Sequence, residues 1–246
     1  MRYAEDLAYV HHTGFADLAR GASPFLLALL ADHGPCDVVD LGCGSGIVLR
    51  ALADAGHRAI GVDLSPAMLA IANKTAPAAT LVLSSLYDAT LPACDAVFAV
   101  GEPLNYVEKN GRAPAVAPLF RRVAQALRPD GLLVFDVIVA GKPSLHKRGY
   151  MAGDDWAVLV DTSDEGAVIT RDVTTFVKRG ADYARSRELH RVRVFDTRAL
   201  ASQLRAAGFS VRVTTSYGAH PLAVRRRAFV CTKTAPKKKP PRTSPK

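Results

Sequence analysis

The sequence has no stretch of about 18 consecutive apolar residues, the length needed to cross a bilayer, although 49% of its 246 residues are hydrophobic. We therefore expect no membrane-spanning helix. The start of the chain carries charged side chains and lacks the apolar centre of a signal peptide. Cysteines are few and never occur as C-x-x-C, which predicts free, buried thiols in a reducing cytoplasm: Cys36, Cys43, Cys94 and Cys231.

Acidic residues are missing from the last stretch of the chain. From Lys233 onward there are six lysines and arginines and no aspartate or glutamate, so this stretch carries six of the nine net positive charges and leaves +3 for the rest. Its Pro- and Lys-rich composition, without an apolar pattern, predicts a disordered tail over residues 233–246. A solvated tail is the simpler interpretation, and salt-dependent phosphate contacts are the alternative.

What the sequence does contain is a short apolar run followed by a glycine-rich turn. The run covers residues 38–41, and Gly42, Gly44 and Gly46 follow at every second position before the helix-like stretch 47–53. Glycine adopts positive φ without steric cost, and the missing Cβ lets a ligand lie against the backbone. A helix that begins here also directs unpaired amide hydrogens toward the turn. The pattern predicts a ligand-binding strand–turn–helix unit.

A second apolar run, residues 59–62, ends at Asp63, about twenty residues beyond the turn, as a βαβ nucleotide-binding unit requires. An aspartate at that strand end can accept hydrogen bonds from both hydroxyls of a ribose. Ser65 and Pro66 are typical of the first positions of a helix. Because Ile47 follows the last glycine, the G-x-G-x-x-G pattern is not matched, which disfavours a nicotinamide-dependent oxidoreductase.

The pattern D-x-G-x-G-x-G from Asp40, with D-x-S-x-x-M-L from Asp63, resembles the class I S-adenosylmethionine-dependent methyltransferases. This resemblance covers roughly residues 36–139 and 196–232. It implies an α/β fold with a doubly wound, Rossmann-like, seven-stranded sheet, and S-adenosyl-L-methionine as the cofactor. The residue that recognises adenine stays open between Ser85, Leu86 and Asp88. The implied cofactor-binding set is Asp40, Gly42, Cys43, Gly44, Gly46, Asp63, Leu64, Met68, Ser85, Leu86 and Val100.

The remaining segments can be assigned from their periodicity and turn residues. Residues 1–34 are expected to form a helical cap, with a helix over 25–32 that begins at Ser23-Pro24, and residues 35–232 the methyltransferase domain. Within that domain, the alternating, charged region 141–195 predicts an antiparallel β insertion after the fifth strand. The insertion resembles that of small-molecule N-methyltransferases, including amino-sugar types. There such strands line the acceptor pocket or join subunits, which leaves a homodimer as one expectation.

The segment Gly101–Tyr106 follows the expected fourth strand, at the end of the sheet where open α/β proteins bind ligands. An amine or hydroxyl acceptor must lose a proton, and Glu102 and His190 are the candidate bases. We find no metal cluster and no Ser/His/Asp spacing. The candidate acceptor-binding residues are Tyr9, His12, Asn105 and Tyr106.

The predicted function is methyl transfer to N or O of a small-molecule acceptor by a cytoplasmic enzyme. One alternative is a nucleic-acid or protein methyltransferase. The N/D-P-P-Y/F signature of base-amino methylation is replaced after the fourth strand by Gly-Glu-Pro-Leu, which makes nucleic acid a less favoured partner. The other alternative is a non-catalytic module that binds S-adenosylmethionine.

Overall fold

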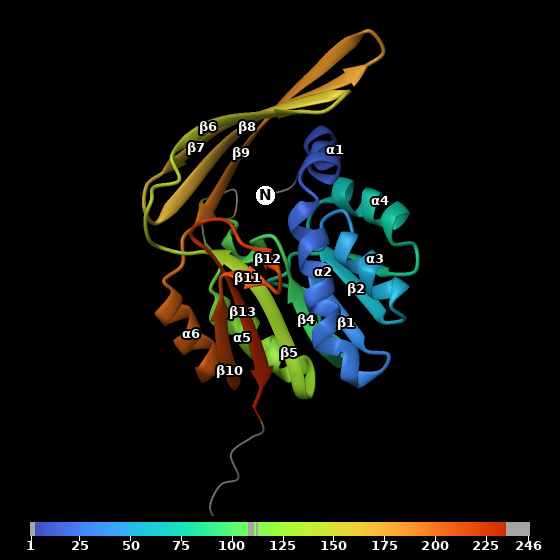
Figure 1. Ribbon diagram of the computed structural model, residues 1–246, viewed down its shortest axis with the longest axis vertical. Coiled ribbons are helices and arrows are strands. Elements are labelled where there is room, and N and C mark those ends of the chain that lie inside the picture. The colour runs from blue at the N-terminus through green and yellow to red at the C-terminus, as the bar shows by residue number, and fades with distance from the viewer. Residues whose placement is uncertain (1–2, 108–110, 112, 235–246) are drawn as a thin grey trace, which may run out of the picture.

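The computed structural model describes residues 3–107, 111 and 113–234, and it consists of a doubly wound domain and a four-stranded sheet that projects from it (Figure 1). Residues 235–246 lie outside the described residues, so the prediction of a disordered tail stays a prediction for them. The predicted start of the tail at Lys233 is wrong, because Lys233 is the last residue of a strand. Within the described residues no single helix is long and apolar enough to span a membrane, and the pair Glu5–Gly14 and Asp17–His33, bent by 62°, meets that criterion only when joined.

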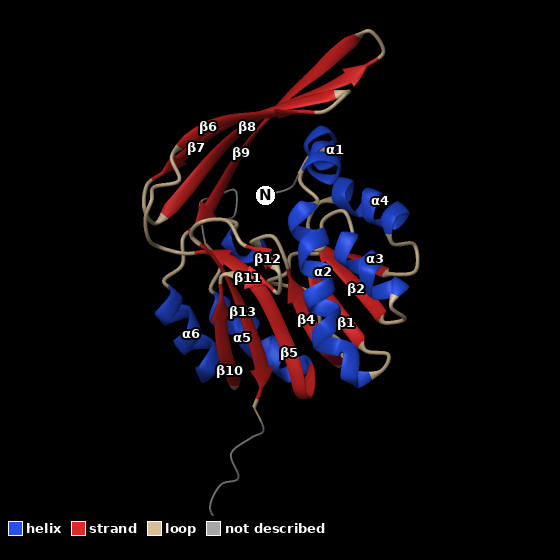
Figure 2. Cartoon of the chain, in the orientation of Figure 1, coloured by secondary structure: helices blue, strands red, loops and turns tan. Residues whose placement is uncertain are grey.

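The central sheet has seven strands in the order β10-β13-β5-β4-β1-β2-β3, and helices cover both faces (Figure 2). Strands β1 to β5 run parallel, whereas β13 is antiparallel to both β5 and β10. This topology confirms the predicted doubly wound fold. The strands are β1 Asp37–Leu41, β2 Arg58–Asp63, β3 Thr80–Leu83, β4 Cys94–Ala99, β5 Leu127–Ile138, β10 Phe209–Thr214 and β13 Arg226–Lys233.

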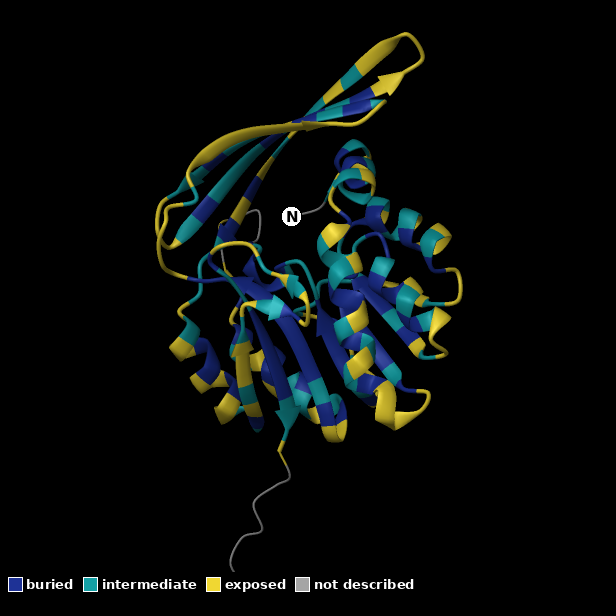
Figure 3. Cartoon of the chain, viewed as in Figure 1, coloured by how far each residue is buried: buried dark blue, intermediate teal, exposed yellow. Residues whose placement is uncertain are grey.

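Neighbouring residues of the central strands face opposite layers of helices. Val38 packs with α2 and α3, whereas Val39 packs with α5 and α6. The strands are therefore apolar on both faces and form the dark interior of Figure 3. The α-helices are α1 Glu5–Gly14, α2 Asp17–Leu30, α3 Ile47–Asp54, α4 Pro66–Thr75, α5 Val116–Ala126 and α6 Thr197–Ala206, and two short 3-10 helices are η1 Ala31–His33 and η2 Pro103–Asn105.

The prediction that a helix begins at Ser23-Pro24 is wrong, because both residues lie inside α2. The helix continues because Leu26 and Leu30 pack into the core on one of its faces, and this burial outweighs the backbone hydrogen bond that Pro24 removes. The Ser23 hydroxyl instead donates to the Ala19 carbonyl at 2.8 Å. By contrast, the predicted cap of α4 is confirmed, since the Met68 amide donates to Ser65 Oγ at 3.2 Å.

The predicted antiparallel insertion is confirmed as the sheet β6-β7-β8-β9, formed by β6 Lys147–Ala152, β7 Trp156–Asp164, β8 Val168–Arg179 and β9 Asp182–Arg193. Its inner face packs on α1, where Leu7 and Val10 contact Trp156 and Val158. Backbone bridges from Tyr106 to Val192 and from Val139 to Phe195 join it to the ends of the central strands. A second feature, the small hairpin β11 Ser216–Tyr217 and β12 His220–Pro221, was not predicted.

A buried ion pair fastens the base of the insertion to the domain. The Arg225 guanidinium binds Asp164, and its Nε donates to the Val139 carbonyl at 3.0 Å. The carboxylate of Asp164 also accepts from the amides of Leu145 at 2.8 Å and Gly166 at 3.0 Å. Both side chains are almost fully buried, 5% and 3% exposed. The orientation of the insertion therefore depends on the Arg225–Asp164 ion pair, which was not predicted from the sequence.

Candidate active site

The three alternate glycines form the turn between β1 and α3, and each has positive φ: 75° at Gly42, 52° at Gly44 and 81° at Gly46. A Cβ on Gly42 would lie 2.5 Å from Cβ of Pro103, and one on Gly46 would lie 3.0 Å from Cβ of Ala72. These two glycines are thus required for close packing. At Gly44 a Cβ would meet nothing within 4 Å, so this part of the turn has room for a ligand.

Asp63 lies at the end of β2 and points toward this turn. Its Oδ2 accepts from the Gly44 amide at 2.9 Å, and its Oδ1 accepts from the Ser65 amide at 2.8 Å. Burial raises the pKa of Asp63, while the backbone hydrogen bonds, among them those from Ser65 and Gly44, lower it, and burial outweighs them. The glycine turn and the strand-end aspartate therefore meet in space, as a cofactor site would require.

Asp40 lies just before the turn and is 2% exposed. Its Oδ1 has no hydrogen-bond partner among the described residues. Burial, followed by the nearby carboxylate of Asp63, raises the pKa of Asp40 to about 7. A buried acceptor without a donor is costly unless a ligand supplies one. Together with the open space at Gly44, this unpartnered oxygen fits a site for a ligand that carries donors and positive charge, as S-adenosylmethionine does.

The other residues predicted to bind the cofactor belong to the turn itself, to α4 and to the segments that follow β2, β3 and β4. Met68 is buried in α4, Leu64 and Val100 are half-buried, and burial raises the pKa of the Cys43 thiol, which keeps it protonated. After β3, the Tyr87 amide donates to Ser85 Oγ at 3.1 Å, so that hydroxyl stabilises its own loop. These roles stay predictions.

On the other side of the turn, a row of ion pairs with alternating acidic and basic side chains extends from the core to the insertion. Arg226 lies 3.5 Å from Asp136 and 2.8 Å from Glu102, and Arg171 of β8 binds the other oxygen of Glu102. Asp136 also accepts from the amides of Gly101 at 2.8 Å and Glu102 at 3.1 Å, and from the Tyr217 hydroxyl at 2.8 Å. These ion pairs and hydrogen bonds hold the backbone of Glu102 in a left-handed conformation, with φ 60°.

The geometry corrects the expectation that Glu102 removes a proton from the acceptor. Burial raises the pKa of Glu102, but Arg171 and Arg226 outweigh burial and hold that pKa below its ordinary value. A carboxylate stabilised in its charged form by two guanidinium groups is a weak base. Glu102 is better described as the anion that orders the two arginines.

Asn105 was expected to orient the acceptor, and this is also corrected. The residue is fully buried, and its amide nitrogen donates to the carbonyls of Ile138 at 3.1 Å and Arg193 at 2.7 Å. Its amide oxygen accepts from the Ile138 amide at 3.2 Å. Both ends of the side chain are used by backbone, so Asn105 fastens the loop after β4 to β5 and β9.

Two N-terminal residues were also expected to bind the acceptor. The Tyr9 hydroxyl donates to Asp155 at 2.7 Å and packs beside Trp156, which gives it a role in holding the insertion. His12 is half-buried, its Nδ1 has no partner among the described residues, and burial, then Arg20, lowers its pKa. Its contact with an acceptor stays a prediction.

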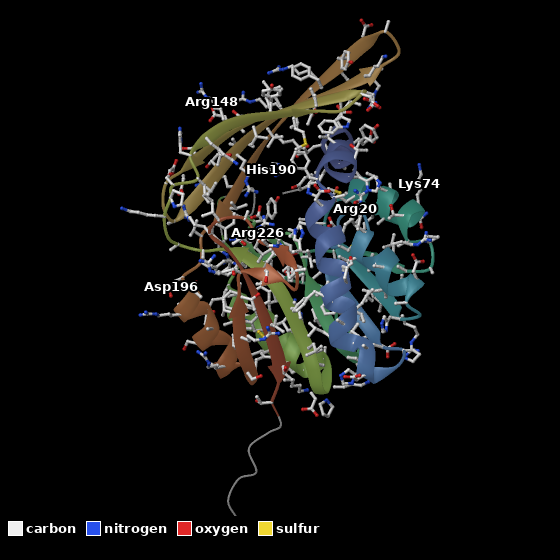
Figure 4. All side chains as sticks on the ribbon, viewed as in Figure 1. Arg20, Lys74, Arg148, His190, Asp196 and Arg226 are labelled. Atoms are coloured by element: carbon white, nitrogen blue, oxygen red, sulfur yellow. The ribbon has the colours of Figure 1, made fainter. Side chains whose placement is uncertain are left out.

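An aromatic cluster instead brings together the segment before α1, the loop after β4 and the insertion. The hydroxyls of Tyr3 and Tyr106 are 2.7 Å apart, and the His190 ring meets Tyr3 edge-on at 4.9 Å between centroids and Tyr106 at 5.8 Å. His190 Nε2 lies 3.0 Å from a carboxylate oxygen of Glu188. Figure 4 shows His190 under the insertion sheet, on the side toward Arg226.

This cluster is connected to the cofactor side of the site. Ser65, the cap of α4 beside Asp63, donates its hydroxyl to the Tyr3 carbonyl at 2.7 Å. The sequence reasoning did not assign roles to five residues of this region: Tyr3, Asp136, Arg171, Glu188 and Arg226. Asp136 had one usable signal, a charge inside an otherwise apolar strand. No group of three or more His, Cys, Asp or Glu side chains within the described part of the chain is placed to hold a metal ion.

Comparison with known proteins agrees with this geometry. A family model described as a methyltransferase domain matches residues 38–131. The dTDP-3-amino-3,6-dideoxy-alpha-D-glucopyranose N,N-dimethyltransferase of Streptomyces fradiae is 31% identical over 219 residues, which cover 85% of this chain and 84% of that relative. A shorter match, 34% over 134 residues and 51% of the relative, is to the malonyl-[acyl-carrier protein] O-methyltransferase of Pseudescherichia vulneris.

Solved structures share the whole fold. The sugar N-methyltransferase KedS8 from a Streptoalloteichus species superposes with a TM-score of 0.75 at 22% identity, covering 96% of this chain and 94% of its own. An S-adenosylmethionine-dependent methyltransferase from Clostridium acetobutylicum gives 0.77 at 16% identity, covering 92% and 99%. The chain therefore belongs to the class I S-adenosylmethionine-dependent methyltransferases. It is an enzyme of that class, and S-adenosylmethionine is its cofactor.

Proposed function

We propose that the enzyme methylates a nitrogen or oxygen atom of a small-molecule acceptor held between the glycine turn and the insertion. The observation that supports this most directly is the hydrogen bond from Ser65 Oγ to the Tyr3 carbonyl, because it joins the cofactor site to the aromatic cluster. S-adenosylmethionine carries an already activated methyl group. The protein's contribution is therefore to align the acceptor and to exclude water.

We assign the removal of the acceptor's proton to His190. A carboxylate can only accept hydrogen bonds, so the contact with Glu188 at 3.0 Å places the proton of the neutral ring on Nε2 and leaves a lone pair on Nδ1. Glu188 also accepts from the Ala4 amide at 3.0 Å, which holds the N-terminal segment beside the ring. In that tautomer Nδ1 can accept a proton, which is what a general base requires.

An amine is the favoured acceptor group. The relative aligned over most of the chain is named for a dTDP-linked amino sugar, and the insertion is shared with a sugar N-methyltransferase structure. A hydroxyl or carboxyl oxygen is the second candidate, because the relative that matches about half of the chain is named as an O-methyltransferase.

Replacing His190 by glutamine should lower kcat by about a hundredfold or more, the usual contribution of general-base catalysis. Affinity for S-adenosylhomocysteine should stay unchanged, because His190 contacts the acceptor side. The measurement is release of S-adenosylhomocysteine with dTDP-linked amino sugars as acceptors, at several pH values. His146→Gln, an exposed histidine before the insertion's first strand, is the control. Full kcat in His190→Gln would exclude this base, and tight cofactor binding without turnover of any acceptor would indicate a binding module.

Three further expectations stay predictions: cytoplasmic localisation, a low affinity for nucleic acid, and a homodimer. The homodimer has one supporting observation, because the outer face of the insertion leaves apolar side chains in solvent. Tyr150 and Leu159 lie opposite each other in the register of β6 and β7 and are 86% and 48% exposed, and Leu189 is 55% exposed.

A further inference from the structure

Arg171 stands at the centre of the region between the insertion and the domain. It lies on the inner face of β8, directly opposite His190 in the register of β8 and β9. Its guanidinium contacts Glu102 of the loop after β4, and its charge is close enough to influence Tyr3 and Tyr106. The side chain is 25% exposed, so solvent reaches part of it.

Most of the hydrogen-bonding capacity of Arg171 is unused. A guanidinium group has five N–H donors, and within the described residues Arg171 makes one hydrogen bond, from Nη1 to Glu102. Arg193, by contrast, donates to the carbonyls of Leu104 and Pro114 and to the Tyr87 hydroxyl. Arg226 is held between two carboxylates. Arg171 therefore keeps a free edge, which in a guanidinium is the planar fork that matches carboxylate and phosphate oxygens.

The carboxylates around Arg171 already have other donors. Glu102 is shared with Arg226, Asp136 accepts from two backbone amides and Tyr217, and Glu188 accepts from the Ala4 amide and contacts His190. Among these carboxylates only Oε2 of Glu102 lacks a hydrogen bond within the described residues, and its charge is matched by the Arg226 guanidinium at 2.8 Å. Glu102 also raises the pKa of Arg171, so the guanidinium stays charged throughout the working pH range.

We propose that Arg171 is an anion-binding subsite, whose free guanidinium edge receives a phosphate or carboxylate group of the methyl acceptor. Glu102 acts here as a positioning residue that fixes the guanidinium plane. This inference rests on the proposed function, since it assigns a substrate class to the same site: a small molecule that carries an anionic group beside the atom to be methylated.

The test is calorimetric titration of the S-adenosylhomocysteine-loaded enzyme with inorganic pyrophosphate and, separately, with succinate. One of these anions should bind saturably, and Arg171→Gln should weaken it by about tenfold or more, as expected for the loss of a charge-assisted hydrogen bond. Arg171→Lys keeps the charge opposite Glu102 but loses the planar fork, so it should weaken binding by a smaller factor and keep the fold.

The matched control is Arg187→Gln, an arginine of the neighbouring strand that is paired with Asp172 and has an exposed side chain. It should leave anion affinity unchanged. Preference for pyrophosphate would identify a phosphorylated acceptor, and preference for succinate a carboxylate acceptor. Absence of saturable binding of either anion, or equal losses in the Arg171 and Arg187 variants, would overturn the proposal. S-adenosylhomocysteine is titrated in a separate experiment with each variant. A loss of cofactor binding is thereby distinguished from a loss of anion binding.

Discussion

Replacing Asp63 by alanine should weaken S-adenosylhomocysteine binding by about tenfold to a hundredfold. The variant loses the carboxylate that can accept from the ribose hydroxyls, and hydrogen bonds to a charged group contribute about 1.5–3 kcal/mol each, with 1.4 kcal/mol for each factor of ten. It also loses the acceptor that holds the Gly44 amide at 2.9 Å, so the turn itself becomes less ordered. Calorimetric titration measures the change.

Two further variants separate the causes of that loss. Asp63→Asn keeps an oxygen that can accept from Gly44 but removes the charge, so it should show an intermediate affinity. Asp54→Ala removes an exposed carboxylate at the far end of α3, where it pairs with Arg50, and should bind like the wild type. An Asp63→Ala enzyme with wild-type affinity would remove this residue from the cofactor site.

The second large effect concerns stability. Asp164→Asn should lower the free energy of unfolding by about 3–5 kcal/mol, because Arg225 would be left buried without its counter-charge. The matched control is Asp161→Asn on the same strand, whose partner Arg148 is 86% exposed, and it should cost less than about 1 kcal/mol. Urea denaturation of the three proteins gives both values. Equal stabilities for the two variants would show that the buried pair does not hold the insertion.

The same pair predicts a pH dependence with a defined direction. Hydrogen bonds from the Leu145 and Gly166 amides, together with Arg225, outweigh burial and hold the pKa of Asp164 at about 2, below its unfolded value of about 3.9. Its stabilisation, about 2.6 kcal/mol, is therefore present above the unfolded pKa of about 4 and lost as the pH falls through the folded pKa of about 2. The stability difference between wild type and Asp164→Asn should shrink over that window, measured by denaturation at each pH.

The cofactor side could be predicted because its signal is local. A strand, a turn of alternate glycines and a strand-end acid lie within one βαβ unit, and the chemistry of ribose and backbone contacts fixes their spacing. The structure brings Gly44 and Asp63 into contact as that spacing requires. The seven-stranded sheet could be predicted for the same reason, since its central strands are apolar on both faces and turn residues separate them.

On the acceptor side, His190 and Tyr106 were named from the sequence, but their contacts could not be predicted because these contacts join distant segments. Glu102 and Arg171 are 69 positions apart, and only the pairing register of β8 and β9 places Arg171 beside His190. Asn105 illustrates a second difficulty: a polar residue in a loop near a strand end can bind a ligand or satisfy buried backbone, and here it does the latter. The helix-breaking preference of proline led to a wrong helix start at Pro24, because the packing of α2 outweighs that preference.

The central claim is that the turn Gly42–Gly46 and Asp63 together hold an adenosyl sulfonium cofactor. Its most direct test is calorimetric titration of the wild-type enzyme with S-adenosylhomocysteine and, in a separate experiment, with NAD+. We predict saturable binding of S-adenosylhomocysteine at one site per chain and no heat from NAD+. Absence of saturable S-adenosylhomocysteine binding, or its displacement by NAD+, would contradict the account.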